Sequence, residues 1–344
     1  MMVASLLLLS LEHTAIAAPG LAHAGVGGAA PPSCSWWYEQ TPHHGFAFRN
    51  VSAFGAIGDG EADDTAALQR AIDYNRGGEP GSEQSKAAAV VYLGPGTYKV
   101  TDTLVLWKWT VLIGNPRCPP TLVLPPNTPS FEGTHGLKPL LVTTVGFNAS
   151  TAAHAWWDQS GPNAVNEHFF TSVRHLRVVI SAGNPGAVAI SWNVAQQTAL
   201  RDVQVTAAND TAVALDLGAG ADYEKLKTSG GSLSAGGVVE DIVLRGALTG
   251  LRIAVTQALL RNIVVQDSMR HGVQVHTGAW SLVALNISVA GAPVGVCHTE
   301  HLFPCLSFRN AALSSLVRLC LCLCHFPSLS LSLSLFLFSI CVWT

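Results

Sequence analysis

Charged residues are scarce in this chain of 344 residues. Asp, Glu, Lys and Arg make up only 12% of it, about half the share of roughly 25% that soluble domains carry. The 19 basic residues against 22 acidic ones give a formal net charge of −3, so the basic surplus that binds a nucleic-acid backbone is missing. A hydrophobic fraction of 49% excludes a disordered chain. We therefore expect a folded protein without a nucleic-acid partner.

Cysteine is absent from most of the chain. Six of the eight cysteines fall between Cys297 and Cys341, and residues 46–296 hold only Cys118. A small secreted domain held by disulfides spaces its cysteines along the whole fold. We therefore predict that the chain has no disulfide framework.

The two ends of the chain differ in composition from its middle. Residues 1–24 contain a short apolar run followed by Ala-x-Ala sites, which predicts a signal peptide and a secreted protein; residues 25–45 follow as an extension. Residues 301–344 include a strict Ser-Leu alternation from Ser328 to Leu335, and we interpret them as an aberrant low-complexity tail encoded by a repeated CT dinucleotide. A membrane anchor is the alternative for this tail, although Pro327 and the many serines oppose it. Without such an anchor we expect no membrane span.

Short apolar strands separated by polar turns recur between residues 173 and 296. Alternating apolar and polar side chains indicate half-buried strands. One series has its central apolar residues at steps of 27, 39, 21 and 24: Leu176, Val203, Ile242, Ile263 and Ile287. A second series lies half a turn later and places its apolar residues at steps of 22 and 21: Ile253, Val275 and Val296.

A repeat of this length, built from strands and turns without helical periodicity, is typical of a solenoid. Stacked coils place each apolar position over its equivalent and form one continuous core. Because β-branched residues dominate and the fixed leucines and asparagine ladder of a leucine-rich repeat are missing, we predict an all-β parallel β-helix over residues 46–300. Residues 221–237 are polar and rich in Gly and Ser, so we expect a loop that leaves the 39-residue coil.

Residues 51–74 are expected to form a strand, a Gly-Asp-Gly turn and a helix. Gly58 and Gly60 allow the positive φ angles that the turn needs. The helix has one apolar face with i, i+3, i+4 spacing, which suits it to cover an open end of the solenoid; this face comprises Leu68, Ala71 and Ile72. The residues expected to accept its first amide hydrogens are Asp63, Asp64 or Thr65. Strands are expected to follow over residues 88–100 and 103–114.

The N-terminal motif of the pectate-lyase-like superfamily resembles GAIGDGEADDTAALQRAI and VVYLGPGTYKV in this chain. Two later segments, residues 189–205 and 234–253, are similar to glycoside hydrolase family 55, the exo-acting glucan 1,3-β-glucosidases. The similarity extends from about Gly45 to Val296. It implies a right-handed parallel β-helix with an N-terminal capping helix, and a polysaccharide partner, foremost β-1,3-glucan.

The same resemblance implies roles for individual residues. The family's W-x-x-A-Q motif begins at Trp192, expected to bind substrate, and ends at Gln196, expected to position the attacking water. The family's Gly-Ser-Gly-Gly segment begins here at Ser234, with Ala235 in place of the serine that contacts the water, so Ser234 is its nearest substitute. The family's general acid lies in a second β-helix that this sequence does not match. We therefore predict glycosidic bond hydrolysis as the family activity, and little or none of it from this chain.

Carboxylates inside the repeats divide into two groups. Those that border the 221–237 loop are further candidates for substrate binding: Asp216, Asp222 and Glu224. Asp202 and Asp241 instead occupy equivalent repeat positions beside Asn262, which favours hydrogen bonding in a turn over catalysis.

Two other functions are compatible with the residues. One is a non-catalytic carbohydrate-binding β-helix, whose aromatic side chains stack on sugars. The other is a pectate-lyase-type enzyme on acidic polysaccharide, in which the candidates for proton abstraction are Arg245, Arg252 and Arg261. Spacings that a zinc ion tolerates occur in two sets, but one follows a strand and the other lies where the resemblance fades, so we expect neither a metal nor a cofactor: His271 and His276, and Cys297, His301 and Cys305.

Overall fold

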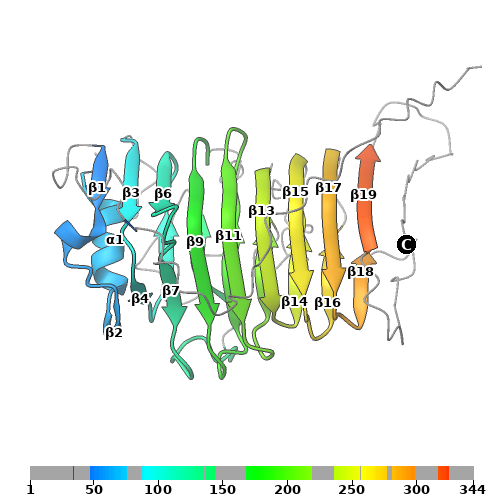
Figure 1. The fold of residues 1–344 in the computed structure, drawn as a ribbon, viewed down its shortest axis with the longest axis horizontal. Helices are drawn as coiled ribbons and strands as arrows, with labels where there is room; N and C mark the ends of the chain where they lie inside the picture. Colours follow the sequence, from blue (N-terminus) through cyan, green and yellow to red (C-terminus); the bar gives the residue numbers. More distant parts are fainter. Residues whose placement is uncertain are drawn as a thin grey trace, which may run out of the picture. The chain divides into compact units, whose positions relative to one another are not determined.

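The computed structural model describes residues 34, 47–75, 87–134, 136–143, 168–218, 236–255, 257–276, 281–298 and 317–324. They all belong to one compact unit that begins at Cys34. Strands dominate this unit, and most of them run side by side with their neighbours in adjacent coils (Figure 1).

The first part of the unit combines short strands with the helix. Its elements are β1 (Phe48–Asn50), the 3-10 turn η2 (Val51–Phe54), β2 (Asp59–Asp63), α1 (Thr65–Asp73), β3 (Ala89–Leu93), β4 (Thr97–Lys99), β5 (Leu104–Leu106), β6 (Thr110–Gly114), β7 (Thr121–Leu124) and β8 (Lys138–Thr143). The strands expected over residues 88–100 and 103–114 are thereby confirmed.

The second part repeats one pattern, a long strand followed by a shorter one. The pairs are β9 (Ser172–Ile180) with β10 (Ala187–Trp192), β11 (Ala199–Ala207) with β12 (Val213–Leu217), β13 (Gly237–Gly246) with β14 (Thr249–Ile253), β15 (Gln257–Gln266) with β16 (His271–Val275), and β17 (Ser281–Ala290) with β18 (Val294–His298). A final strand, β19 (Val317–Cys324), follows.

The long and the short strands form two separate sheets. The long ones pair in the order β9-β11-β13-β15-β17, and the short ones in the order β10-β12-β14-β16-β18. Every pairing within these two runs is parallel. A parallel connection between coils is right-handed in nearly all proteins. The predicted fold, an all-β right-handed parallel β-helix, is confirmed.

The predicted core column is present. Leu176 pairs with Val203, Val203 with Ile242, Ile242 with Ile263, and Ile263 with Ile287, and all five side chains are buried. In the second sheet one predicted equivalence is wrong. Ile253 does pair with Val275, but Val275 pairs with His298, and Val296 lies beside Val273. The last coil is therefore two residues longer than the apolar spacing predicts.

A column of left-handed residues divides each long strand. These residues directly precede the core column, and their φ angles lie between 49° and 57°: His175, Asp202, Asp241, Asn262 and Asn286. Asn and Asp adopt this conformation more readily than other residues with a side chain. Because β6 pairs with the first part of β9 and β7 with the second, the column marks a corner of the coil.

The N-terminal turn and helix also follow the prediction. Gly58 and Gly60 have φ angles of 71° and 82°, and the apolar face of α1 is buried. Asp63 accepts a hydrogen bond from the first helical amide, that of Thr65, at 3.0 Å. Asp64 has a different role from the predicted cap, since its carboxylate accepts from the amides of Ile57 and Gly58 at 2.7 and 3.1 Å.

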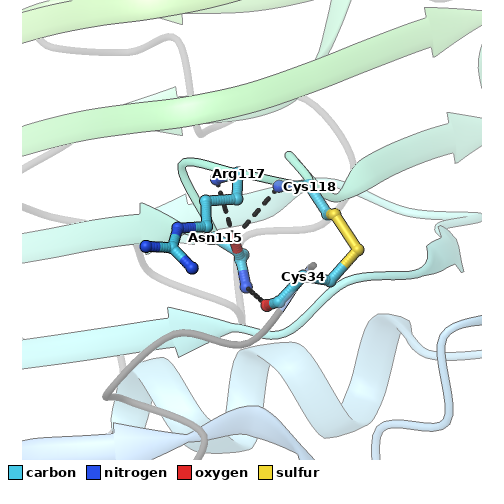
Figure 2. Close-up of a disulfide and its surroundings, with 4 residues drawn as sticks. All are labelled: Cys34, Asn115, Arg117 and Cys118. Carbon is cyan, nitrogen blue, oxygen red and sulfur yellow. Dashed lines mark hydrogen bonds between the residues drawn. A yellow bond between two sulfur atoms is a disulfide. The ribbon is translucent and has the colours of Figure 1, made fainter. Parts of the chain in front are cut away.

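A disulfide joins Cys34 to Cys118, 84 residues later, and Cys297 is disulfide-bonded as well. The cysteine spacing in the sequence did not predict these bonds. Figure 2 shows how Asn115 holds the bridged segment: its amide donates to the carbonyl of Cys34 at 2.7 Å, and its side-chain oxygen accepts from the backbone of Arg117 and Cys118. The bridge attaches Cys34 to the loop between β6 and β7.

The C-terminal segment contributes one described strand. β19, inside the region predicted to be an aberrant tail, pairs with β17 in antiparallel orientation, so it follows the last parallel strand of the long sheet (Figure 1). Among the described residues no helix is both long and apolar enough to cross a bilayer. The predicted signal peptide and the 221–235 part of the predicted loop lie outside the described residues.

Candidate functional site

Gln196 lies on a turn at one corner of the coil. The turn leaves β10 at Trp192 and enters β11 at Ala199. Thr198 closes it, because its hydroxyl donates to the carbonyl of Ala195 at 3.0 Å. Gln196 and Gln197 are both exposed, and Gln197 is left-handed, with a φ angle of 60°. The corner therefore presents two carboxamides to solvent.

The next coil returns to the same corner at Gly236 and Gly237. The amide of Val238 donates to the carbonyl of Thr198 at 3.0 Å, and Ala199 pairs with Val238. A Cβ on Gly237 would lie 2.1 Å from the Thr198 hydroxyl, so only glycine fits there. The two family-like segments, which begin at Trp192 and Ser234, thus converge in the fold. Ser234 itself lies outside the described residues, as do Asp222 and Glu224.

Trp192 belongs to the core beneath this corner. Its side chain is fully buried, and its indole nitrogen donates to the carbonyl of Gly236 at 3.2 Å. A ring in this position has no face turned to solvent on which a sugar could stack. Its hydrogen bond instead fixes the backbone of the Gly236 turn against the Gln196 turn. Its predicted contact with substrate stays a prediction.

Asp216 is buried on β12 and is engaged by an arginine. Its side chain is 1% exposed, and one oxygen accepts from Nε of Arg252 at 2.8 Å. Ser191 is its neighbour in register on β10 and accepts from the amide of Asn193 at 2.9 Å. The second oxygen of Asp216 is buried and has no hydrogen-bond partner among the described residues. Its role in substrate binding also stays a prediction.

A second buried carboxylate, Glu240, was not among the predicted site residues. It lies between Arg201 and Arg261 of the two adjacent coils, and it forms an ion pair with each, at 2.6 Å to Arg201. Arg245 donates to Gln266 at 3.0 Å. The arginines considered for proton abstraction in a lyase are therefore each bonded to a neighbour on a different coil, and they do not form one basic site.

The carboxylates assigned to turns do form hydrogen bonds there. Nδ1 of His175 lies 2.7 Å from Asp202, the amide of Asn262 donates to Asp241 at 2.9 Å, and Asn286 donates to Asn262 at 2.9 Å. These contacts run along the left-handed corner of the coil and support the structural interpretation.

The described residues contain no group of three or more His, Cys, Asp or Glu side chains placed to hold a metal ion. The zinc alternative at Cys297, His301 and Cys305 loses a ligand, because Cys297 is disulfide-bonded and zinc binds the free thiolate.

Residues 48–297 match the protein-family model described as "Rhamnogalacturonase A/epimerase, pectate lyase-like". This range begins at β1 and ends inside β18, so it includes the Gln196 corner and every strand of the parallel coils.

Two curated relatives are fungal glucanases. The chain is 29% identical over 250 residues to a glucan 1,3-beta-glucosidase of Cochliobolus carbonum, and 25% identical over 275 residues to a probable glucan endo-1,3-beta-glucosidase of Arthroderma benhamiae. These alignments include 71% and 76% of this chain. In both cases the chain spans 28% of the length of the relative.

Solved structures resemble the chain more distantly. The Agl-KA catalytic domain is 12% identical, with a TM-score of 0.45, and the match covers 76% of this chain and 45% of that one. The A-module of the Azotobacter vinelandii mannuronan C-5 epimerase AlgE4 is 18% identical, with a TM-score of 0.39, over 72% of this chain and 59% of that one.

Proposed function

The chain belongs to the rhamnogalacturonase A/epimerase, pectate lyase-like family, and from this premise we propose that it is a polysaccharide-active β-helix protein whose site is the corner around Gln196. The names of its two fungal relatives favour β-1,3-glucan as the polysaccharide. We propose secretion as well, because a disulfide such as Cys34–Cys118 forms and persists in oxidising compartments.

The observation that carries this proposal is the convergence of two turns. The indole of Trp192 donates to Gly236, and Thr198 accepts from Val238, so the turn with Gln196 and the start of β13 are held together. Gln196 itself is exposed. A carboxamide both donates and accepts hydrogen bonds, which suits it to orient a water molecule or a sugar hydroxyl.

Glycoside hydrolysis by inversion requires a carboxylic acid at the leaving oxygen and a separate group that activates water. We assign the water-positioning role to Gln196 and assign no general acid. The two buried carboxylates of the long and short sheets, Glu240 and Asp216, each form ion pairs with arginines. We therefore propose that this chain binds glucan and hydrolyses it weakly or not at all.

The test uses the full chain and laminarin, a soluble β-1,3-glucan. Affinity electrophoresis measures binding and chromatography measures released glucose. We expect laminarin to retard the protein. We expect Gln196→Ala to lower the affinity for laminarin about tenfold, which is equivalent to about 1.4 kcal/mol of binding free energy. Gln204→Ala is the matched control, because Gln204 lies on the same coil within β11.

Several outcomes would overturn the proposal. Laminarin that fails to bind the unchanged chain, or that binds Gln196→Ala equally well, excludes the corner as a glucan site. Glucose release at the rate of a complete glucanase contradicts the predicted weak hydrolysis. Calcium-dependent formation of unsaturated products from pectate would select the lyase alternative.

A further inference from the structure

Two aromatic residues occupy the Gln196 corner in the two coils that precede it. Trp109 donates its amide to the carbonyl of Phe169 at 3.0 Å, and the register of β6, β9, β11 and β13 continues into the turns. One residue from each of four successive coils therefore stands at the same corner position: Trp109, Phe170, Gln197 and Gly236.

All four of these residues have positive φ angles. They measure 62° at Trp109, 56° at Phe170, 60° at Gln197 and 73° at Gly236. Glycine adopts this conformation freely, whereas it is unfavourable for a bulky side chain. Unfavourable backbone conformations of this kind concentrate at functional sites. The fold therefore keeps two aromatic rings at positions where their own backbone disfavours them.

Neither ring belongs to the buried core of the β-helix. Phe170 is 55% exposed, and Trp109 is half-buried. Each ring has one neighbouring side chain of its own turn beside it: the ammonium of Lys108 lies 5.6 Å from the centre of the Trp109 ring, and the ring of Phe169 lies 6.2 Å from that of Phe170. Phe170 therefore presents apolar surface to solvent, and Trp109 presents a smaller part of its side chain.

The backbone that carries the rings is firmly held. The hydroxyl of Thr110 donates to the carbonyl of Trp107 at 2.6 Å, and Thr171, at the equivalent position of the next coil, is fully buried. Thr198 continues this column below Gln197. Three buried threonines thus fix three successive turns, so the residues before them project from a rigid edge.

We propose that Trp109 and Phe170 form a stacking platform that extends the glucan site by two coils beyond Gln196. This inference rests on the proposed function. The apolar C–H faces of a pyranose pack against aromatic rings, and neighbouring coils of parallel strands lie about 4.8 Å apart, so the rings lie in series with Gln197, the neighbour of Gln196, along one corner. The occupant is a neutral β-1,3-glucan chain laid parallel to the axis of the solenoid.

The test compares ligand length and protein stability in the same variants. Phe170→Asn removes the ring and places a residue that tolerates the left-handed conformation. We expect its affinity for laminarihexaose to fall about tenfold, while its melting temperature stays equal or rises. Trp109→Asn should behave in the same way. Binding of laminaribiose, which is too short to reach both the platform and Gln196, should change less than about twofold.

The matched control is Ile57→Asn, which removes a side chain that is 66% exposed in the turn before α1. Its affinity for both sugars should equal that of the unchanged chain. If Phe170→Asn lowers the melting temperature and leaves hexaose affinity unchanged, the ring is structural and the platform is excluded. If the unchanged chain binds neither sugar, the proposed function itself fails, which is a separate result.

Discussion

Several charged residues in the described sheets form ion pairs across coils. Arg201, Glu240 and Arg261 occupy one equivalent position in three successive coils, and the segments LRDVQV, VEDIVL and LRNIVV already align them in the sequence. Considering each arginine alone, as the lyase interpretation does, misses this alternation of charge. Comparing the outward positions of neighbouring repeats would have revealed it, because side chains in register lie next to each other.

We expect Glu240→Gln to lower the free energy of unfolding by about 1–2 kcal/mol. The side chain of Glu240 is 9% exposed, but the arginines are 42% and 51% exposed, so solvent screens both pairs and the loss stays below that of a fully buried pair. Urea denaturation measures it. Asp241→Asn, the adjacent exposed residue, retains an acceptor for Asn262 and should change stability by less than about 0.5 kcal/mol. Equal losses of unfolding free energy in both variants would contradict the stabilising role assigned to the ion pairs of Glu240.

The N-terminal turn and helix show what sequence patterns determine in an element and what they leave open. The positive φ angles of Gly58 and Gly60 and the buried face of α1 follow from residue types and spacing. Residue types and spacing do not determine which of three neighbouring polar residues caps the helix, because each has an oxygen within reach of a free amide. Asp64 is directed to the preceding turn since the amides of Ile57 and Gly58 need an acceptor.

Asp59 makes this turn sensitive to acid. The backbone amides of Ala62 and Glu61, both donating at 2.8 Å, hold the pKa of its carboxyl below the usual value. A lowered pKa in the folded state stabilises the fold above the ordinary pKa of about 3.9, and this contribution is lost as the pH falls through the lowered value. Asp59→Asn should therefore be less stable than the unchanged chain in urea at pH 6, and the difference should shrink as the pH falls below the ordinary pKa of the carboxyl. A difference that is independent of pH would refute this.

For the whole molecule, local periodicity predicted the architecture and missed its long-range links. The core column from Leu176 to Ile287 was predictable because stacked coils repeat one apolar position. The pairing of Cys34 with Cys118 was not, since nothing near either residue specifies a partner 84 positions away. The burial of Trp192 was not predictable either, because it depends on which face of β10 turns inward. The two-residue error at Val296 arises because the spacing of apolar residues does not report the length of the loop between them.

The Cys34–Cys118 bridge should stabilise the whole β-helix. A disulfide closing so long a loop restricts the unfolded chain and contributes about 2–4 kcal/mol. We expect Cys118→Ser and Cys34→Ser to lower the unfolding free energy equally, and the double variant to be no less stable than either. Urea denaturation checks this, and losses that add in the double variant would show that the two cysteines act separately.

Hydrogen exchange followed by mass spectrometry, with and without laminarihexaose, tests most directly that one corner of the β-helix is the glucan site. The account predicts slower exchange at residues 107–110, 168–171, 193–198 and 236–238, and unchanged exchange in β16. Protection confined to other segments, or none at a concentration of sugar that saturates binding, would contradict it.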